Sequence, residues 1–173
     1  MSQVKENKQS DDPRHWRDIE LAVNGKRHKL KAASTWTLND VLRNVLEMTG
    51  TKRACDYGGC GSCTVLIDGL DAYSCVTLAV EAEGKDIQTI EALSDAPEPH
   101  PLQKRFAALY AAQCGWCTPG MIMSAKALLD RNPDPTDDDI RVALSGVLCR
   151  CTGYTAVVRA VQEAAVELRG GQR

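Results

Sequence analysis

Eight cysteines in two sets of four constrain this chain more than any other feature of its 173 residues. So many thiols in one chain indicate either disulfides or thiolate metal ligands. No apolar segment of a secretion signal occurs near Met1, and in a reducing compartment thiolates bind metals rather than form disulfides. We therefore expect a cytoplasmic chain with two tetrathiolate sites, for zinc or for iron–sulfur centres. The sets are Cys55, Cys60, Cys63 and Cys75, then Cys114, Cys117, Cys149 and Cys151.

The spacing of the first set favours an iron–sulfur cluster. Four residues separate Cys55 from Cys60, two separate Cys60 from Cys63, and eleven lie before Cys75. This pattern is typical of plant-type [2Fe-2S] ferredoxins. Three glycines between Cys55 and Cys63 let the loop curl so that backbone N–H groups face the sulfurs. A zinc site does not need such a loop, and its ligands usually come in pairs about two to four residues apart.

The second set is less specific by itself. Two residues separate its first pair and one separates its second pair, which suits a four-thiolate zinc site as well as a cluster. Cys117 precedes a helix that we expect to begin at Thr118–Pro119, and Cys151 precedes a turn into a helix opened by Thr155. Two helix N-termini would then direct free N–H groups toward an anionic centre. This arrangement supports a metal site without identifying the metal.

Hydrophobic periodicity predicts a small sheet in the first half. Residues 1–17 lack such periodicity and are expected to form a flexible extension. The Asn24-Gly25 pair predicts a two-residue hairpin turn, and Thr37 with Asp40 predicts a capped helix start. Cys75 is expected on a strand. The predicted elements are strands Ile19–Val23 and His28–Ala32, a helix from Leu38 to about Met48, and strands Thr64–Ile67, Tyr73–Val80 and Asp86–Ile90.

A proline-rich segment at 94–101 predicts a linker between a β-grasp domain at 18–93 and a helical domain at 102–173. Beyond the linker, apolar residues recur at helical spacing in four segments, which predicts a four-helix bundle. The expected fold class is therefore α+β. The four helical segments are Leu102–Tyr110, Ile122–Leu129, Ile140–Leu148 and Val157–Leu168.

Charge and hydropathy exclude two classes of partner. The net charge is −2 and no cluster of Lys and Arg stands out, so nucleic acid is not an expected partner. No run of about 18 apolar residues occurs, so no membrane span is expected. With 5% aromatic residues and one Phe, each domain would have a thin core that a bound metal would strengthen.

Three blocks of sequence, in one order, resemble the iron–sulfur subunit of the xanthine dehydrogenase family of molybdenum hydroxylases. The likeness covers about residues 18–167 and includes all eight cysteines. It departs at Ala54, where Gly is usual, at Ser62, where Ala is usual, and at Val147, where Asn is common; none of these removes a ligand. The blocks are Gly50-Thr51-Lys52 with Cys55–Val65, then Gln113–Met123, then Leu148–Tyr154.

The resemblance implies one [2Fe-2S] cluster in a plant-type ferredoxin-like domain, a second in the helical domain, and no catalytic residue in this chain. It also implies that Gln113 hydrogen-bonds the pterin of a molybdenum cofactor on a separate large catalytic subunit, with Cys151 close to that pterin. Without the resemblance, Gln113 would be interpreted as a helix cap. The further implications are a molybdopterin of the cytosine dinucleotide form, a medium FAD-binding subunit and a dimer of heterotrimers.

The implied function is electron transfer, one electron at a time, from molybdenum through the helical-domain cluster and the ferredoxin-like cluster to a flavin or other acceptor. Two alternatives remain open: a free-standing two-cluster carrier, and a zinc-stabilised interaction module without redox chemistry. A lone carrier does not need the second domain, which favours the subunit. Substrate choice would lie in the large subunit, so an aldehyde, a purine, another N-heterocycle, carbon monoxide or an aromatic acyl-CoA all remain candidates.

Overall fold

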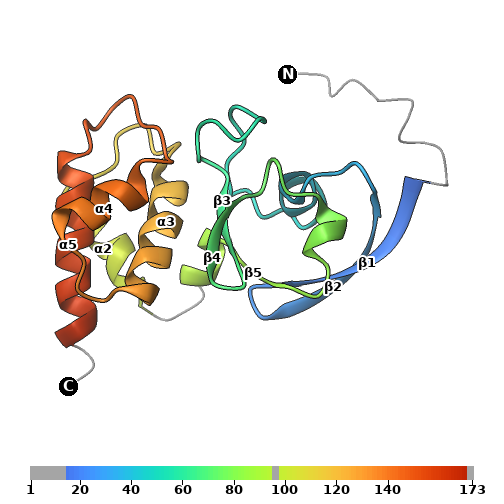
Figure 1. Ribbon diagram of the computed structural model, residues 1–173, viewed down its shortest axis with the longest axis horizontal. Coiled ribbons are helices and arrows are strands. Elements are labelled where there is room, and N and C mark those ends of the chain that lie inside the picture. Colours follow the sequence, from blue (N-terminus) through green and yellow to red (C-terminus); the bar gives the residue numbers. More distant parts are fainter. Residues whose placement is uncertain (1–14, 95–97, 171–173) are drawn as a thin grey trace.

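The computed structural model describes residues 15–94 and 98–170. Most of the predicted flexible extension at 1–17 lies outside these residues. The prediction is wrong for its last two residues, because strand β1 begins at Trp16. A small sheet and a group of helices lie side by side (Figure 1). The two predicted halves of an α+β chain are therefore present, while the exact domain boundaries stay predictions.

The first half is a five-stranded mixed sheet in the order β2-β1-β5-β3-β4. β1 runs parallel to β5, whereas the β1–β2, β3–β4 and β3–β5 pairs are antiparallel. The predicted β3 is confirmed residue for residue. The strands are β1 Trp16–Val23, β2 Lys26–Ala33, β3 Thr64–Ile67, β4 Leu70–Tyr73 and β5 Asp86–Gln88.

The predicted hairpin is confirmed and is longer than expected. Its turn has left-handed backbone at Asn24 (φ 51°) and Gly25 (φ 74°), as a two-residue turn between twisted strands requires. The Asn24 amide also joins the hairpin to the chain after β5, because its Nδ2 donates to Thr89 Oγ1 at 2.9 Å and its Oδ1 accepts from Thr89 N at 2.8 Å. These bonds fix β1 against β5.

The predicted helix after Thr37 forms but is shorter than expected. The capping box is confirmed: Asp40 N donates to Thr37 Oγ1 at 3.1 Å, and Thr37 N donates to Asp40 Oδ2 at 3.0 Å. Helix α1 spans Leu38–Asp40 and widens into a π-helical turn at Val41–Val45. The left-handed backbone of Glu47 (φ 57°) then prevents the helix from reaching Met48.

The predicted strand Tyr73–Val80 is wrong. The chain leaves the sheet after Tyr73, where Val76 N and Thr77 Oγ1 both donate to Tyr73 O, at 3.2 and 3.0 Å. These bonds form a turn that moves Cys75 out of the sheet. Two short 3₁₀ helices follow, at Ala79–Ala82 and at Ile90–Leu93, so that β5 also ends earlier than predicted.

The second half contains the four predicted helices. The Thr136–Asp139 capping box is confirmed. One cap was not predicted: His100 Nδ1 accepts a hydrogen bond from Leu102 N at 3.2 Å and so begins the first of the four. The helices are α2 Pro101–Ala108, α3 Thr118–Arg131, α4 Asp137–Leu144 and α5 Thr155–Gly170.

Each half has its own core, and the larger core belongs to the helices. Met121 and Met123 of α3 are fully buried in it, beside Phe106 of α2. Leu66 of β3 joins the same core, so the sheet and the helices are packed against one another. Across the described part of the chain, no helix combines the length and the apolar character needed to cross a bilayer.

Candidate metal centres

The first site is a loop at one end of the sheet. No disulfide joins any of the eight cysteines, all of which lie in the described residues. Cys55 and Cys60 are half-buried, whereas Cys63 and Cys75 are buried. Cys55 and Cys60 are near enough to share a hydrogen bond, and so are Cys63 and Cys75. The structure therefore brings the four cysteines of the first set together in two close pairs.

Left-handed backbone gives the Cys55–Cys63 loop its curl. Gly58 (φ 79°) and Gly61 (φ 69°) adopt it, as predicted from their lack of a Cβ atom, whereas Gly59 does not and Asp56 (φ 61°) does. The curl directs the backbone N–H groups of Tyr57, Gly59 and Cys60 toward the sulfur of Cys55. The bond from Tyr57 is the main reason why the pKa of Cys55 falls to about 7. Cys55 is thus readily available as a thiolate ligand.

Cys75 reaches the site from a turn, not from a strand as predicted. Ser74 holds this turn, since its Oγ donates to Cys63 O at 2.8 Å and accepts from Asn39 Nδ2 at 3.0 Å. Asn39 is buried in the short helix α1 and also donates through its backbone N to Ser74 O at 3.0 Å. We did not predict a role for Asn39, although an Asn between the apolar residues of a short helix was a usable signal.

The second site lies where two helices begin. Cys117 is the N-terminal cap residue of α3, and Cys151 lies in the turn that enters α5. The sulfurs of Cys114 and Cys151 are 3.6 Å apart, and both residues are exposed. Cys117 is buried and lies close enough to Cys149 to share a hydrogen bond. All four cysteines of the second set are therefore also brought together in two pairs.

Cys149 sits in a cradle of hydrogen-bond donors. Its Sγ accepts from Thr152 Oγ1 at 3.2 Å and from the backbone N atoms of Cys151 and Thr152, both at 3.4 Å. Burial alone would raise the pKa of Cys149, but these bonds outweigh it and lower the pKa to about 7. The Tyr154 hydroxyl secures the cradle by accepting from Cys149 N at 2.7 Å and donating to Val147 O at 3.0 Å.

Each site pairs its acidic thiol with a strongly basic one. Burial is the main cause that raises the pKa of Cys75 to about 12, and it does the same for Cys117. The neighbouring sulfurs of Cys63 and Cys149, respectively, add to these shifts. A positive metal centre would reverse this effect, because four close thiols can share a site as thiolates only when a cation compensates their charge.

The donor geometry fits a two-iron cluster. A [2Fe-2S] cluster is held by four thiolates that are divided between two iron atoms. The close pairs in each set agree with that division.

Gln113 lies at the rim of the second site. Its Nε2 donates to Cys151 O at 3.1 Å, so it does not cap the preceding helix α2, which was the alternative interpretation. Both residues are exposed. The structure thus brings together the two residues that the resemblance connects with a pterin.

A backbone hydrogen bond joins the two sites directly. Leu148 N donates to Cys60 O at 2.9 Å. Cys60 belongs to the first set, and Leu148 precedes Cys149 of the second. Beside this bond, Lys52 Nζ lies 5.7 Å from the centre of the Trp116 ring, a cation–π contact between the two cysteine loops.

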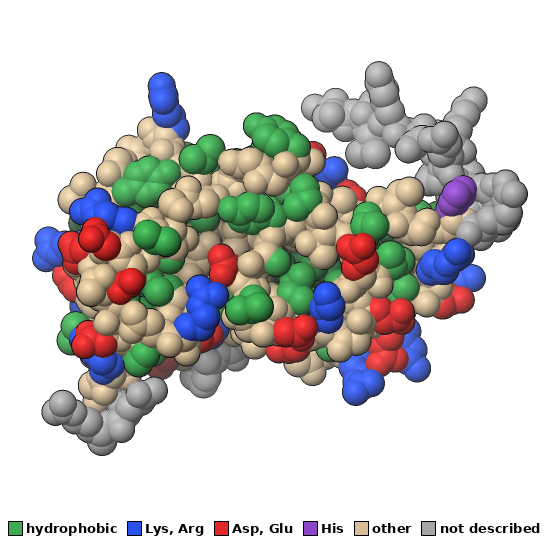
Figure 2. All heavy atoms as spheres, in the orientation of Figure 1, with side chains coloured by type: hydrophobic (Ala, Val, Ile, Leu, Met, Phe, Trp, Pro, Cys, Tyr) green, Lys and Arg blue, Asp and Glu red, His purple; other side chains and the backbone are tan. Residues whose placement is uncertain are grey.

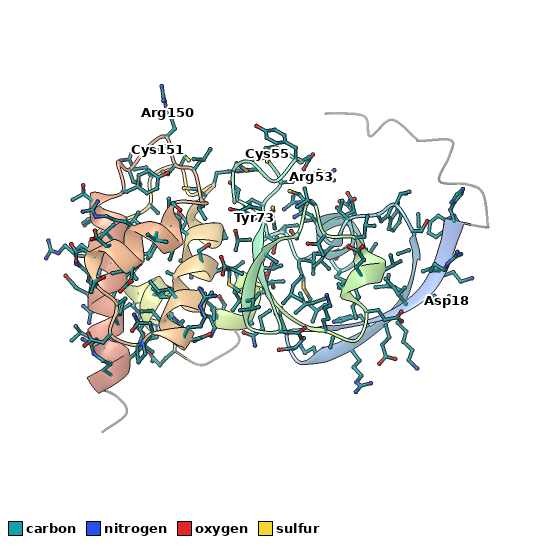
Figure 3. The ribbon with its side chains drawn as sticks, in the orientation of Figure 1. Asp18, Arg53, Cys55, Tyr73, Arg150 and Cys151 are labelled. Carbon is teal, nitrogen blue, oxygen red and sulfur yellow. The ribbon has the colours of Figure 1, made fainter. Side chains whose placement is uncertain are left out.

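Both sites open on the same side of the molecule, where Figure 3 labels Cys55, Cys151 and the outward-pointing Arg150. Large apolar side chains are exposed around them, and Figure 2 shows apolar groups along this side. Singly exposed apolar residues are ordinary, but several around two thiolate sites indicate a surface that another protein covers. We call this surface the apolar rim. It comprises Tyr57, Val76, Trp116 and Leu148, which are 76%, 55%, 48% and 58% exposed.

Comparisons with known proteins agree with this geometry. A family model described as a 2Fe-2S iron-sulfur cluster binding domain matches residues 21–94. A second, described as a [2Fe-2S] binding domain, matches residues 89–162. The chain therefore contains two [2Fe-2S]-binding domains, one ferredoxin-like and one helical, as predicted.

Similar whole proteins are subunits of oxidoreductases. The small subunit of nicotine 6-hydroxylase from Paenarthrobacter nicotinovorans is 48% identical over 85% of this chain and 88% of its own length. A probable xanthine dehydrogenase subunit from Bacillus subtilis is 44% identical over 88% of this chain and 88% of its own length. A chain in the crystal structure of quinoline 2-oxidoreductase from Pseudomonas putida 86 superposes with a TM-score of 0.86 and 43% identity, over 92% of this chain and 99% of that one. This chain accordingly belongs to the family of electron-transferring iron–sulfur subunits of the molybdenum hydroxylases, the xanthine dehydrogenase family.

Proposed function

We propose that all eight cysteines are ligands, and that this chain carries electrons from a molybdenum cofactor to a flavin or other acceptor. Cys55, Cys60, Cys63 and Cys75 would hold one [2Fe-2S] cluster, and Cys114, Cys117, Cys149 and Cys151 the other. When bound, each cluster accepts and releases one electron at a time. The observation that carries the proposal is the Leu148–Cys60 hydrogen bond, because it connects Cys60 of the first set to the residue next to Cys149 of the second.

The direction of transfer is the one that the family resemblance implies, and exposure supports it. Cys114 and Cys151 are exposed at the second site, beside Gln113. A partner's cofactor can reach this edge, so we assign electron entry to the helical half and exit to the Cys55 loop. Gln113 and Cys151 would face the pterin of the large subunit, a molybdopterin in the cytosine dinucleotide form.

The partners would cover the apolar rim. A large molybdopterin-binding subunit is assigned to Trp116 and Leu148 near the second site, and a medium FAD-binding subunit to Tyr57 near the first. The assembly would be a dimer of such heterotrimers in the cytoplasm. Burial of these side chains is the expected source of affinity, since exposed aromatic residues are common anchors of protein interfaces.

The first experiment is purification of the chain under anaerobic conditions from cells that express the neighbouring subunits. We expect a red-brown complex with about four iron and four acid-labile sulfide per chain and a large molybdopterin-binding partner. A colourless protein that contains zinc would overturn the cluster assignment. A red-brown chain that purifies alone and is fully active would overturn the partners and support a free-standing carrier.

A second experiment tests electron entry. Gln113→Ala removes the bond to Cys151 O and the proposed pterin contact, so we expect electron transfer from molybdenum to slow about tenfold, as for loss of one good hydrogen bond. Gln162→Ala is the matched control, because Gln162 lies on α5 and bonds to Asp137 instead. Equal rates in the two variants would contradict the role of Gln113.

A further inference from the structure

Tyr73 connects the two halves of the molecule through its hydroxyl group. It is the last residue of β4 and lies two residues before Cys75. Its hydroxyl donates to Gly146 O at 2.9 Å, and Gly146 lies three residues before Cys149. Tyr73 is partly buried, and Figure 3 places it beneath the Cys55 loop. One side chain thus spans from the turn of one cysteine set to the turn of the other.

The hydroxyl fits only because residue 146 has no side chain. A Cβ atom on Gly146 would lie 2.3 Å from the Tyr73 hydroxyl oxygen but 3.5 Å from Tyr73 Cζ. The first distance is a severe clash, whereas the second is an ordinary contact. Gly146 does not have a left-handed backbone. The backbone would therefore accept alanine at this position, and the steric conflict lies with the Tyr73 oxygen alone.

The turn that Tyr73 holds is the one that contacts the first cysteine loop. Leu148 N donates to Cys60 O, and a Cβ atom on Gly61 would lie 2.2 Å from Gly146 O. Residues 146–148 therefore run along Cys60 and Gly61 with backbone against backbone. Such a close contact has few side chains to fix its register, so the Tyr73 bond is well placed to do so.

The other polar contacts between the halves are weaker candidates. Arg131 Nη1 and Asp71 Oδ1 are 3.4 Å apart, and both side chains are well exposed. The Lys52–Trp116 contact depends on a flexible lysine side chain over an exposed ring. Exposed pairs of this kind contribute little to a fixed geometry. Tyr73 differs because its ring is rigid and its acceptor is a backbone carbonyl.

We propose that Tyr73 is a positioning residue that sets the register between the two cysteine sites. By binding Gly146 O, its hydroxyl keeps residues 146–148 on the Cys60 loop and so holds Leu148 N–H on Cys60 O. Electron transfer between the sites depends on this register. That last step rests on the function proposed above, whereas the packing role does not.

A double-mutant cycle in the full chain, as purified and whatever its iron content, tests the packing role. Gly146→Ala should lower the midpoint of urea unfolding most, because its methyl group meets the Tyr73 hydroxyl. Tyr73→Phe should lower it slightly. In the double variant the methyl group meets only the ring, so the midpoint should return to that of Tyr73→Phe. Gly61→Ala should gain nothing from Tyr73→Phe, because its clash is with backbone and its φ is 69°.

Two further measurements on Tyr73→Phe test the register. Deuterium uptake by the Leu148 amide should become roughly five-fold faster, the factor for loss of one neutral hydrogen bond. Transfer between the clusters, followed by freeze-quench paramagnetic resonance, should slow by a similar factor while the spectrum of each cluster is retained. Tyr110→Phe is the control, since Tyr110 is 86% exposed on the helical half; it should change neither.

The possible outcomes separate the two proposals. The packing role would be overturned if Gly146→Ala lowered the midpoint of urea unfolding by the same amount in the wild type and in the Tyr73→Phe background. Unchanged Leu148 exchange, or unchanged transfer despite faster exchange, would overturn the positioning role. A chain without iron and sulfide would overturn the proposed function only, because the unfolding cycle and the exchange measurement need no cluster.

Discussion

The two cysteine sites share their chemistry but differ in how the fold builds them. Each contains one thiol whose pKa is lowered to about 7, Cys55 or Cys149, and one whose pKa is raised to about 12, Cys75 or Cys117. In the first site, however, three cysteines come from a single loop. In the second site, helices bring together two pairs that are distant in sequence, Cys114 with Cys117 and Cys149 with Cys151. A similar set of thiols is therefore obtained once by local backbone curvature and once by tertiary packing.

The largest expected effect comes from ligand substitutions that separate the two sites. Cys114→Ser should abolish electron flow from molybdenum and the paramagnetic signal of the second cluster, while the signal of the Cys55 loop remains. Cys55→Ser should abolish the signal of the Cys55-loop cluster, retain that of the second cluster, and stop transfer to the acceptor. Paramagnetic resonance of each variant, with an assay of each half-reaction, checks this. Loss of both signals in either variant would show that the sites do not assemble independently.

Removal of iron by a chelator should affect the sheet half more than the helical half. The sheet half has the smaller apolar core, so a larger share of its stability would come from the bound centre. Deuterium exchange of the chelated protein should show near-complete exchange in β3 and β4, with substantial protection left in α3 and α5. Equal loss of protection in both halves would contradict this difference.

Gly120→Ala tests how tightly the second half presses on the first. A Cβ atom on Gly120 would lie 2.4 Å from Gly61 O, a backbone atom that cannot move aside easily. We expect a loss of about 1–3 kcal/mol in the free energy of unfolding. The control is Gly170→Ala at the end of α5, where nothing lies within 4 Å, and which should be neutral or stabilising by up to about 1 kcal/mol. Urea titration of both variants gives the comparison, and equal midpoints would exclude the clash.

The smallest effect concerns the two matching capping boxes. The carboxyl groups of Asp40 and Asp139 both have lowered pKa values. At Asp40, burial would raise the pKa, but hydrogen bonds from Thr37 and Arg53 lower it by more. At Asp139, hydrogen bonds from Thr136 lower the pKa. A lowered pKa gives stability that is present above the ordinary value and is lost as pH falls through the folded value. Below about pH 4, the wild-type protein should therefore lose part of its stability.

Asp40→Asn should reduce this acid sensitivity more than Asp139→Asn, because Arg53 Nη1 also lies 2.6 Å from Asp40 Oδ1. The cost of Asp40→Asn at neutral pH should be about 1 kcal/mol or less, since the pair is partly exposed. Thermal unfolding from pH 3 to pH 7 measures both variants. A steeper acid response in Asp40→Asn than in the wild type would reverse the assigned sign.

The contrast between the sites also explains what could be predicted from sequence. The Cys55–Cys63 loop was predictable because its spacing and glycines act locally. The hairpin at Asn24-Gly25 and the helix starts at Thr37 and Thr136 were predictable for the same reason. Each of these features depends on a few neighbouring residues whose backbone preferences agree.

Features that depend on distant residues were not predicted. The segment Tyr73–Val80 is rich in apolar and β-branched residues, as a strand would be, but bonds from Asn39 to Ser74 favour a turn. The contact between Gly61 and Gly146 could not be predicted from the sequence. A close approach of two backbones requires only a glycine at each position, and a single glycine does not show which distant residue it contacts. For the second site, the sequence predicted the four thiolates. It did not predict the Leu148–Cys60 hydrogen bond that joins the second site to the first, because these residues are far apart along the chain.

The division of the second site between two helix N-termini has a consequence for the maturation of the protein. The ligands of the Cys55 loop lie close together along the chain, so this site can close soon after synthesis of β4 with little loss of chain entropy. The second site must wait until α3, α4 and the start of α5 have been made and packed. We therefore expect the two centres to be inserted in a fixed order during biogenesis, with the exposed one last, when a delivery protein can still reach Cys114 and Cys151.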